Sequence, residues 1–501
     1  MSILMLALWL AAPATCEGLA SLKLPDATIT LAQSVPAGTF TLPATAATRT
    51  VSLSNLPAFC RVAATLKPTN DSDIKIEVWL PQSGWNGKFQ AVGNGGWAGV
   101  ITYTSGTGGI ENGMAEALKR GYATSSTDTG HAGNTASGLL GHPEKVTDYD
   151  YRAVHEMTLT AKKVIAGFYG RGPDLSYFNG CSTGGRQALK EAQTFYEDYD
   201  GIIAGAPAAD VAHMAAGRLW VAHATLKDPA SYIPPSKYPM IHEAVMKSCD
   251  AADGLKDGLI DDPRQCHFDP SALVCTDPNG SCLTGPQAAA AQKIMSPVVN
   301  PRTGKQIFPR LEPGTELEWG RQASGPEPYY TSLERLRYVI FKDPKWDWRS
   351  FDFDRDVTRI ESIDKGNATD PNLKSFVSRG GKLLMYHGWA DQSIAPTATI
   401  KYYDSVVSAM GGPQSTANWL RLFMLPGMNH CGGGEGPNAF DAIGTLEQWV
   451  EKGKAPDQIL ASHRTNGKVD RTRPLCPYPQ VAKFKGSGSV DDATNFTCKA
   501  P

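Results

Sequence analysis

The chain of 501 residues is longer than one typical domain, and its composition, 41% hydrophobic and 20% charged, is that of a globular protein. Its formal net charge is -2, so neither nucleic acid nor an anionic membrane surface is indicated as a partner. We expect a core domain that carries a large insertion.

The amino terminus contains one strongly apolar run, residues 3–12, which is too short to span a bilayer. The small residues Ala12-Pro13-Ala14 follow it and resemble a cleavage site. We therefore interpret residues 1–14 as a signal peptide and expect a secreted or periplasmic protein. The alternative interpretation is a buried N-terminal strand.

Apolar residues alternate from 74 to 80 and predict a strand with one buried face. A short strand is expected at 89–92, a helix over 111–120 that ends at Gly121, and a strand over 122–126. The stretch 93–99, Gly-Asn-Gly-Gly-Trp-Ala-Gly, follows an early strand, where α/β-hydrolases place one N–H of the oxyanion hole. We assign that role to Gly96; the alternative is a plain flexible loop.

A second glycine-rich turn contains Gly180, Ser182 and Gly184, which spell G-x-S-x-G. A long amphipathic helix is expected at 151–169, an apolar strand at 175–178 precedes the motif, and a helical pattern follows it. Strand, sharp turn and helix are the context of a nucleophile elbow, in which the serine sits at a helix N-terminus that favours negative charge. Because the motif is also common in non-catalytic turns, its significance depends on partner residues.

The alternation of strands and helices stops after a strand predicted at 201–206. Residues from about 210 to about 364 carry four of the ten cysteines, many prolines and several tryptophans, and we interpret them as an inserted lid domain. Strands at 382–386 and 419–425 and a helix at 444–452 then resume the alternation. The expected organisation is an α/β-hydrolase core made of 15–209 and 365–501, interrupted by a lid at 210–364.

Two candidate partners of the serine follow strands in the second part of the core. Asp391 lies in a turn and His430 in a glycine-rich loop, and the order Ser182, Asp391, His430 is that of α/β-hydrolases. Alone, each would be read as a turn aspartate and a surface histidine. Their shared order and their position after strands predict a catalytic triad. His131 precedes the serine, the wrong order for the base, and we interpret it as structural or pocket-lining.

The triad assigns a role to each residue. Ser182 is expected to attack an ester carbonyl, His430 to act as general base and then general acid, and Asp391 to orient the imidazole. The N–H groups of Thr183 and Gly96 are expected to form the oxyanion hole.

The lid contains an acidic loop, Cys249-Asp250-Ala251-Ala252-Asp253-Gly254-Leu255-Lys256-Asp257-Gly258-Leu259. Its three aspartates and the carbonyls of Leu255 and Leu259 have the spacing of ligands for one hard cation, and we expect Ca²⁺. The loop is not an EF-hand, because no glutamate closes it. A solvated acidic loop is the alternative.

Ten cysteines without a C-x-x-C pair argue against zinc and thioredoxin-like chemistry and favour disulfides formed in an oxidising compartment. Short separations suggest three local pairs: Cys249 with Cys266, Cys275 with Cys282, and Cys476 with Cys498. Cys181 precedes the predicted nucleophile and Cys431 follows the predicted base, so a bridge between them would join the two catalytic loops.

Together these residues resemble the tannase and feruloyl esterase family of α/β-hydrolases. The matching pieces are Gly180-Cys181-Ser182-Thr183-Gly184-Gly185-Arg186, His387-Gly388-Trp389-Ala390-Asp391, His430-Cys431 and the loop from Asp250. The resemblance implies the pair Cys181–Cys431, the three local pairs and Cys16–Cys60. It also implies calcium ligands at Asp250, Asp253, Leu255, Asp257 and Leu259.

The family implies hydrolysis of aromatic carboxylic esters, here of feruloyl or related hydroxycinnamoyl type, either as small molecules or attached to plant cell-wall polysaccharide or polyphenol. Galloyl esters and terephthalate monoesters are alternatives. The related terephthalate monoester hydrolase has a glutamate where this chain has Thr183, as in feruloyl esterases, so terephthalate monoesters are less expected. A non-catalytic binding protein on the same fold is the alternative from another class, and the complete triad argues against it.

Four lid aromatics are candidates either for the substrate pocket or for the core of the lid: Trp319, Tyr329, Tyr330 and Phe341.

Overall fold

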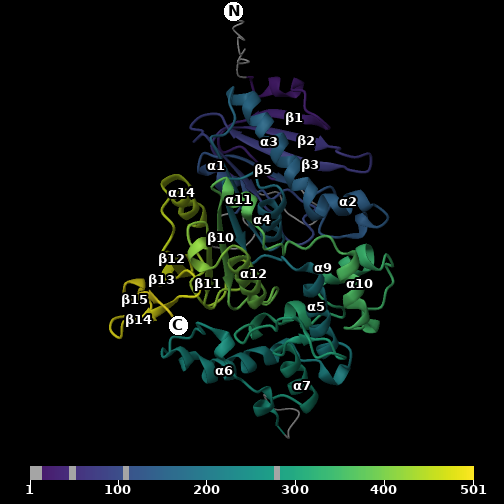
Figure 1. The fold of residues 1–501 in the computed structure, drawn as a ribbon, viewed down its shortest axis with the longest axis vertical. Coiled ribbons are helices and arrows are strands. Elements are labelled where there is room, and N and C mark those ends of the chain that lie inside the picture. The colour runs from purple at the N-terminus through teal and green to yellow at the C-terminus, as the bar shows by residue number, and fades with distance from the viewer. Residues whose placement is uncertain (1–13, 44–51, 105–111, 276–281) are drawn as a thin grey trace, which may run out of the picture.

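The computed structural model describes residues 14–43, 52–104, 112–275 and 282–501, so nearly all of the predicted signal peptide lies outside the described residues. A mixed sheet of nine strands in the order β1-β2-β3-β5-β4-β6-β7-β10-β11 forms the centre of the molecule (Figure 1). The strands are β1 Ala27–Val35, β2 Phe59–Leu66, β3 Ile74–Pro81, β4 Lys88–Val92, β5 Ala123–Thr127, β6 Leu175–Cys181, β7 Gly201–Gly205, β10 Lys382–Gly388 and β11 Leu420–Leu425. The pairs from β1 to β5 are antiparallel, and those from β5 to β11 are parallel.

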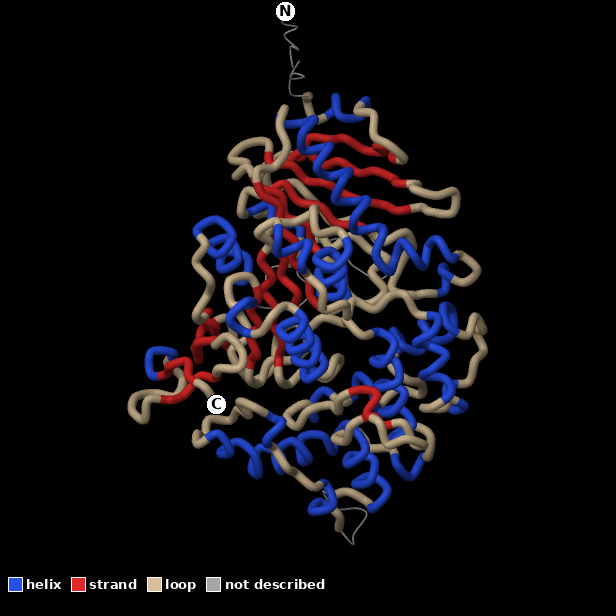
Figure 2. Tube along the Cα trace, in the orientation of Figure 1, coloured by secondary structure: helices blue, strands red, loops and turns tan. Residues whose placement is uncertain are grey.

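Helices cover both faces of this sheet (Figure 2). Helices α3, α4, α11 and α12 pack into the apolar cluster on one face, whereas α1 and α14 pack on the other. The core helices are α1 Met114–Lys119, α2 Pro143–Thr147, α3 Ala153–Tyr169, α4 Thr183–Thr194, α11 Lys374–Ser378, α12 Pro396–Ala409, α13 Pro413–Thr416 and α14 Ala442–Lys452. A largely parallel sheet buried between helices is the α/β architecture that the sequence predicted, and the fold class is confirmed.

The seven strands predicted for the core are all present, as β3, β4, β5, β6, β7, β10 and β11. The prediction that the strand at 74–80 has one exposed face is wrong, because seven of the eight residues of β3 are buried. On its second face Trp79 packs against Phe59, with ring centroids 4.6 Å apart, and Arg61 forms an ion pair with Glu77. A buried strand can carry a glutamate at this position because the arginine balances its charge.

Residues 210–364, which we call the lid, lie between β7 and β10 in the chain and below the sheet in Figure 1. Their elements are α5 Val211–Thr225, α6 Tyr238–Cys249, α7 Gly285–Ile294, β8 Val298–Val299, β9 Gln306–Phe308, α8 Gly320–Ala323, α9 Tyr330–Glu334 and α10 Arg355–Ile363. The Ala368 N–H donates to the Ala209 carbonyl at 2.7 Å, so the chain returns to the core beside the point where it left.

The lid has an apolar cluster of its own, which contains Ile241 and Trp319. A second cluster is shared, since Leu336 of the lid packs with Trp97 and Tyr149 of the core. The shared cluster fixes the lid against the core loops instead of leaving it hinged on its two connections.

All ten cysteines lie in described residues and are paired, as Cys16–Cys60, Cys181–Cys431, Cys249–Cys266, Cys275–Cys282 and Cys476–Cys498. These are the pairs that the family resemblance implied. The last one joins two C-terminal hairpins, β12 Ile459–Thr465 with β13 Lys468–Leu475 and β14 Val481–Phe484 with β15 Phe496–Lys499. Within the described ranges, the search for a helix with the length and apolar character of a membrane span found none.

A buried ionic cluster joins the lid to the core behind α4. Arg335 of the lid donates from Nε to Asp364 at 2.7 Å and from Nη2 to Asp150 of the core at 3.2 Å. Arg186 of α4 approaches the same Asp150 carboxylate at 3.5 Å. The four side chains are at most 5% exposed, so each charge depends on the others for compensation.

We expect Arg335→Ala to lower the free energy of unfolding by about 3–5 kcal/mol, because it leaves the carboxylates of Asp150 and Asp364 buried without their main partner. The measurement is urea denaturation followed by circular dichroism. Arg302→Ala is the matched control, since the Arg302–Asp354 pair is surface-exposed and is expected to contribute less than about 1 kcal/mol. Equal losses in the two variants would contradict this account of the interface.

Candidate active site

Ser182 sits in a strained turn between β6 and α4. It is the N-cap residue of α4, with φ 66° and ψ −120°, a conformation that L-residues rarely adopt. Strand and helix cross closely here: a Cβ added to Gly180 would lie 2.6 Å from the backbone of Gly184, so only glycine fits. The predicted nucleophile elbow therefore has the local geometry that presents the serine hydroxyl.

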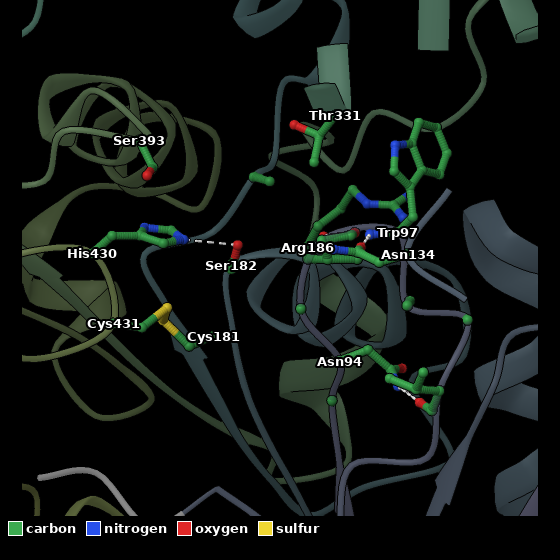
Figure 3. A pocket seen from close by; sticks show the side chains of 18 of the residues that line it. Asn94, Trp97, Asn134, Cys181, Ser182, Arg186, Thr331, Ser393, His430 and Cys431 are labelled. Atoms are coloured by element: carbon green, nitrogen blue, oxygen red, sulfur yellow. Dashed lines mark hydrogen bonds between the residues drawn. A yellow bond between two sulfur atoms is a disulfide. The ribbon is translucent and has the colours of Figure 1, made fainter. Parts of the chain in front are cut away.

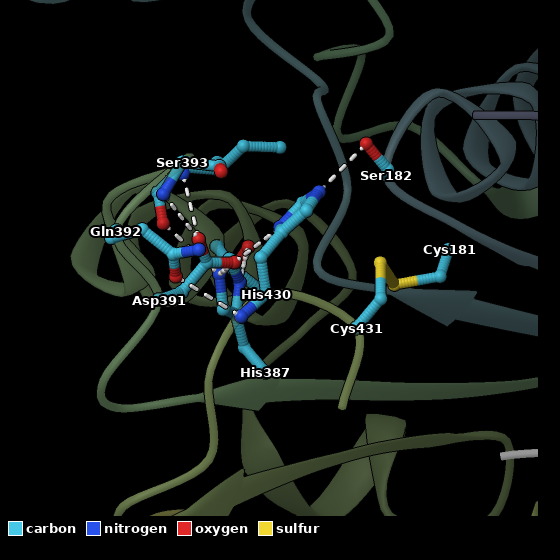
Figure 4. Close-up of a disulfide and its surroundings, with 10 residues drawn as sticks. Cys181, Ser182, His387, Asp391, Gln392, Ser393, His430 and Cys431 are labelled. Atoms are coloured by element: carbon cyan, nitrogen blue, oxygen red, sulfur yellow. Dashed lines mark hydrogen bonds and ion pairs between the residues drawn. A yellow bond between two sulfur atoms is a disulfide. The ribbon is translucent and has the colours of Figure 1, made fainter. Parts of the chain in front are cut away.

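The structure brings the three predicted triad residues into one hydrogen-bonded line, seen in Figure 4. His430 Nε2 lies 2.9 Å from Ser182 Oγ, and His430 Nδ1 lies 2.7 Å from Asp391 Oδ2. With a carboxylate at Nδ1, the proton of the neutral imidazole is placed on Nδ1, which leaves the lone pair of Nε2 facing the serine hydroxyl. The serine proton can therefore move to His430.

The Asp391 carboxylate is fully buried and accepts four hydrogen bonds. Oδ1 accepts from the backbone N–H groups of Ser393 and Ile394, and Oδ2 accepts from His430 and from a second histidine, His387, at 2.9 Å. Burial alone would raise the pKa of Asp391, but the two histidines and their hydrogen bonds hold it below its ordinary value. Asp391 is therefore a fixed negative charge behind the imidazole.

The disulfide Cys181–Cys431 lies directly beside this line, with the two Cα atoms 6.0 Å apart (Figure 4). Cys181 is the last residue of β6, and Cys431 follows His430 in a loop where its own φ is +63°. The bond thus joins the residue before Ser182, the predicted nucleophile, to the residue after His430, the predicted base.

The glycine-rich loop predicted to supply an oxyanion N–H lies against the start of α4. Thr183 Oγ1 donates to the Gly96 carbonyl at 2.7 Å, and the Trp97 N–H donates to Asn134 Oδ1 at 2.8 Å. Asn134 Nδ2 in turn donates to the hydroxyl of Tyr330 from the lid at 2.6 Å. The peptide between Gly96 and Trp97 is therefore held at both its carbonyl and its N–H.

Gly96 itself adopts φ +56°, and a Cβ there would meet Asn134 and Tyr330 at 2.5 and 2.7 Å. Within the described residues, the N–H groups of Thr183 and Gly96 donate to no protein acceptor. Both residues border the same space as Ser182, so these two donors are available to a ligand there.

A cavity of about 560 Å³ opens in front of Ser182 and His430 (Figure 3). Its size is within the range of small-molecule sites. Aromatic side chains from core and lid border it: Trp97, Tyr149, Tyr329 and Tyr330. Of the four lid aromatics that were candidates for the pocket, Trp319 is instead buried in the core of the lid, and Phe341 stacks on Trp346 with centroids 4.4 Å apart.

The acidic loop predicted to bind calcium lies at the end of α6, where it contacts the C-terminal hairpins. Asp250 Oδ1 accepts from the N–H groups of Asp257 and Gly258, and Arg473 forms an ion pair with Asp257 Oδ2. The carbonyls of Leu255 and Leu259 accept no hydrogen bond from any described residue. The loop thus offers two unused carbonyl oxygens beside its carboxylates.

A fourth aspartate of this region, Asp261, was not among the predicted ligands. It is buried, and burial together with the nearby charges of Asp253 and Asp257 raises the pKa of Asp261 to about 7. The carboxylates of the acidic loop are not clustered: no three of their oxygens lie within 4.8 Å of one another. Among the described residues, one group of three His, Cys, Asp or Glu side chains does have ligand atoms that close together, namely His155, Glu191 and Asp198. In that group His155 Nδ1 already pairs with Asp198 at 2.6 Å.

Sequence reasoning gave no role to three residues of the site. His387 stood in the quoted motif, and a histidine at a strand end four residues before the triad aspartate was a usable signal. Asn134 and Arg218 carry no local signal, because their partners are more than 30 residues away in the chain. His131, as interpreted from the sequence, is buried and packs on Tyr149, with ring centroids 5.6 Å apart.

Comparison with known proteins gives a consistent result. The family model "Tannase and feruloyl esterase" matches residues 60–499. An uncharacterized esterase of Xanthomonas campestris pv. campestris is 39% identical over 97% of this chain and 91% of its own length. A probable feruloyl esterase B-2 of Neosartorya fischeri is 32% identical over 95% of this chain and 94% of the relative.

Comparison with solved structures supports the same family. Feruloyl esterase B from Aspergillus oryzae has a TM-score of 0.89 at 30% identity and covers 97% of this chain and 99% of that chain. Tannin acyl hydrolase from Aspergillus niger has a TM-score of 0.77 at 22% identity, with 96% and 93% coverage, and shares the fold. The chain therefore belongs to the tannase and feruloyl esterase family of α/β-hydrolases and is a carboxylic ester hydrolase.

Proposed function

We propose that the protein is a secreted or periplasmic serine esterase that cleaves feruloyl-type aromatic esters through an acyl-enzyme on Ser182. One observation carries the proposal: the hydrogen-bonded line Ser182–His430–Asp391 borders a cavity of about 560 Å³. A hydroxyl, a base and an orienting carboxylate in this arrangement are the parts that nucleophilic acyl transfer needs.

In the proposed reaction, Ser182 Oγ attacks the ester carbonyl carbon while His430 Nε2 takes its proton. The N–H groups of Thr183 and Gly96 stabilise the oxyanion of the tetrahedral intermediate. His430 then protonates the departing alcohol oxygen, which leaves the acyl group on Ser182. A water molecule, deprotonated by His430, attacks the acyl-enzyme and releases the acid, and the Asp391 charge stabilises the imidazolium in both halves.

The aromatic substrate class is supported by the side chains around the cavity and by the names of the relatives. Five tryptophan and tyrosine rings border the cavity, Tyr103 among them, which suits the flat face of a hydroxycinnamoyl group. Relatives with 30–33% identity are named feruloyl esterases B. Initial rates on methyl ferulate, methyl gallate and a terephthalate monoester, side by side, separate this proposal from its two alternatives within the family.

The compartment is part of the same proposal. Five disulfides are stable in an oxidising environment and rare in a reducing cytosol. An enzyme outside the cytoplasm meets esters of plant cell-wall polysaccharide or polyphenol as well as small esters, and we propose both as substrates.

We also propose that the acidic loop of the lid binds a structural calcium ion through Asp250, Asp253, Asp257 and the carbonyls of Leu255 and Leu259. The donor chemistry suits the ion, because the loop combines carboxylates with two carbonyls that accept no hydrogen bond, although three carboxylate oxygens do not lie within 4.8 Å of one another. Bound calcium would neutralise this charge. A Cβ at Gly427 would lie 2.6 Å from Leu259, so the loop also packs against the segment that leads to His430.

Replacing the nucleophile tests the triad. We expect Ser182→Ala to lower kcat by about 10⁴-fold or more, since loss of a triad nucleophile typically costs that much. The assay is hydrolysis of methyl ferulate, with circular dichroism to establish folding. Ser378→Ala on the exposed side of α11 is the control and should keep full activity. A folded Ser182→Ala enzyme with more than a hundredth of the parental kcat would refute the mechanism.

The contacts of the oxyanion loop predict a second effect on turnover. Asn134→Ala removes the acceptor of the Trp97 N–H and the link to Tyr330, so the loop is held less firmly, and we expect kcat to fall about 10-fold with little change in KM. Asn134→Asp keeps the acceptor and should restore most of the activity. A loss that falls on KM alone would mean that Asn134 serves substrate binding instead.

The calcium proposal predicts a change in stability. Chelation with EGTA should lower Tm by several degrees, and added Ca²⁺ should restore it, because a ligand that binds the folded state stabilises it by mass action. The double variant Asp253→Asn, Asp257→Asn should lose bound calcium in elemental analysis and no longer respond to EGTA. Asp269→Asn, an exposed lid aspartate, is the control. An unchanged Tm in EGTA, with no calcium in the purified protein, would rule the site out.

A further inference from the structure

The charged side chains around the active-site cavity are all of one sign. The permanently charged residues among the described lining residues are four arginines, Arg186, Arg218, Arg321 and Arg335, and there is no aspartate or glutamate among them. Arg186 and Arg335 pair with Asp150, and Arg335 also pairs with Asp364. Arg321 is half exposed, 3.9 Å from Glu318. Arg218 is different, because it is buried and has no such partner.

Arg218 comes from α5 and is 6% exposed. No carboxylate of the described residues lies within the ion-pair distance of 4.0 Å from its guanidinium nitrogens. Its partners are neutral: Nη1 donates to the hydroxyls of Thr331 and Ser332, and Nη2 donates to the Ser393 carbonyl at 3.1 Å. These bonds use three of the five N–H groups that a guanidinium carries, and Nε has no partner in the part of the chain that the structure describes.

The surroundings of Arg218 do not compensate its charge. The guanidinium lies over the ring of Tyr329, 4.6 Å from the centroid, which is a weak attraction compared with an ion pair. Burial lowers the pKa of Arg218, and among ionised groups the carboxylate of Asp391 is the one that most opposes this shift. That carboxylate is already saturated by four donors. A buried charge without a partner is costly for the free protein, and an anion in the cavity would relieve that cost.

We propose that Arg218 makes this cavity a recognition site for esters that carry a carboxylate, so that the substrate supplies the counter-charge that the protein lacks. The inference rests on the proposed function, since it concerns the substrate of the same site. Arg218 acts as a specificity residue: its uncompensated charge at the cavity favours an anionic substrate over a neutral one of the same shape. The carboxylate can belong to the acyl half or to the alcohol half of the ester.

Two pairs of isosteric esters test the proposal and separate these two sources. The acyl pair is methyl 4-carboxycinnamate and methyl 4-carbamoylcinnamate. The alcohol pair is the feruloyl ester of glycolate and that of glycolamide. Each pair differs in charge and hardly in volume. We expect the anionic member of one pair to have the higher kcat/KM, by at least about 10-fold, because a site built for a polar group rejects the analogue that lacks it.

The variants Arg218→Gln and Arg218→Lys assign the effect to this residue. In Arg218→Gln the ratio of kcat/KM for the anionic ester to that for the neutral ester should fall to within about 2-fold of unity. In Arg218→Lys the preference for the anionic ester should be largely retained, because the positive charge is retained. Comparing ratios between enzymes cancels the intrinsic reactivity of each ester. Arg321→Gln is the matched control: Arg321 lies at the exposed border of the cavity, and its removal should change the ratio less.

A binding measurement keeps the test independent of how these variants fold. Ser182→Ala retains Arg218, and isothermal titration should give a Kd at least about 10-fold lower for the anionic ester than for its neutral partner. Equal Kd values in both pairs, or an Arg218→Gln enzyme with the parental ratio, would overturn the inference. Hydrolysis of the neutral esters that depends on Ser182 would leave the proposed function intact in that case, whereas no hydrolysis of any ester would contradict the proposed function itself.

Discussion

The arrangement of the active site depends on one covalent constraint, the disulfide between Cys181 and Cys431. It joins the end of β6 to the loop that follows β11, and these two strands are separated in the sheet by β7 and β10, so no strand pairing fixes one relative to the other. Ser182 follows one cysteine, and His430 precedes the other. With Cα atoms 6.0 Å apart, the bond holds the two loops together although the cysteines are separated by 250 positions in the sequence, with the whole lid between them. The disulfide, and not contact with the lid, therefore sets the position of Ser182 relative to His430.

The lid nevertheless contacts two loops of the site: the glycine-rich loop that contains Gly96 and the loop that follows His430. Tyr330 reaches the oxyanion loop through Asn134, and His242 of α6 lies 3.1 Å from Glu435 in the loop that follows His430. The acidic loop approaches the same segment through Leu259. Because Arg335 and a shared apolar cluster anchor the lid to the core, these contacts act as fixed supports for two loops that carry many glycines.

Buried charge has a partner at several places among the described residues and lacks one at others. Asp391 has two histidines and two backbone donors, and Asp150 and Asp364 have arginines. Two of the places that lack one are the arginine-lined cavity, where Arg218 has no counter-charge among the described residues, and the acidic loop, where burial and neighbouring aspartates raise the pKa of Asp253 and of Asp261. These are the two places for which we propose ligands, of opposite charge, because a ligand is the remaining source of compensation.

The sequence by itself determined the fold class, the family and the ester hydrolase activity, and it predicted the three residues of the triad. Ser182, Asp391 and His430 were identifiable because local signals surround each of them: a glycine-framed turn, or a loop directly after an apolar strand, in an order that one fold class uses. The strands β1 and β2 were missed, and β3 was assigned an exposed face, because its burial depends on Arg61 and Phe59 from a neighbouring strand.

Only the tertiary structure decided which distant side chains meet. Asn134 accepts a hydrogen bond from the loop that contains Gly96, and His387 bonds to Asp391. Arg218 is buried among neutral partners. These features depend on how the elements pack in the folded chain. The tertiary structure also sorted the lid aromatics, placing Tyr329 and Tyr330 at the cavity and Trp319 in the core of the lid. Periodicity and spacing describe neighbours along the chain, whereas these contacts arise from packing between elements, on which local sequence carries no information.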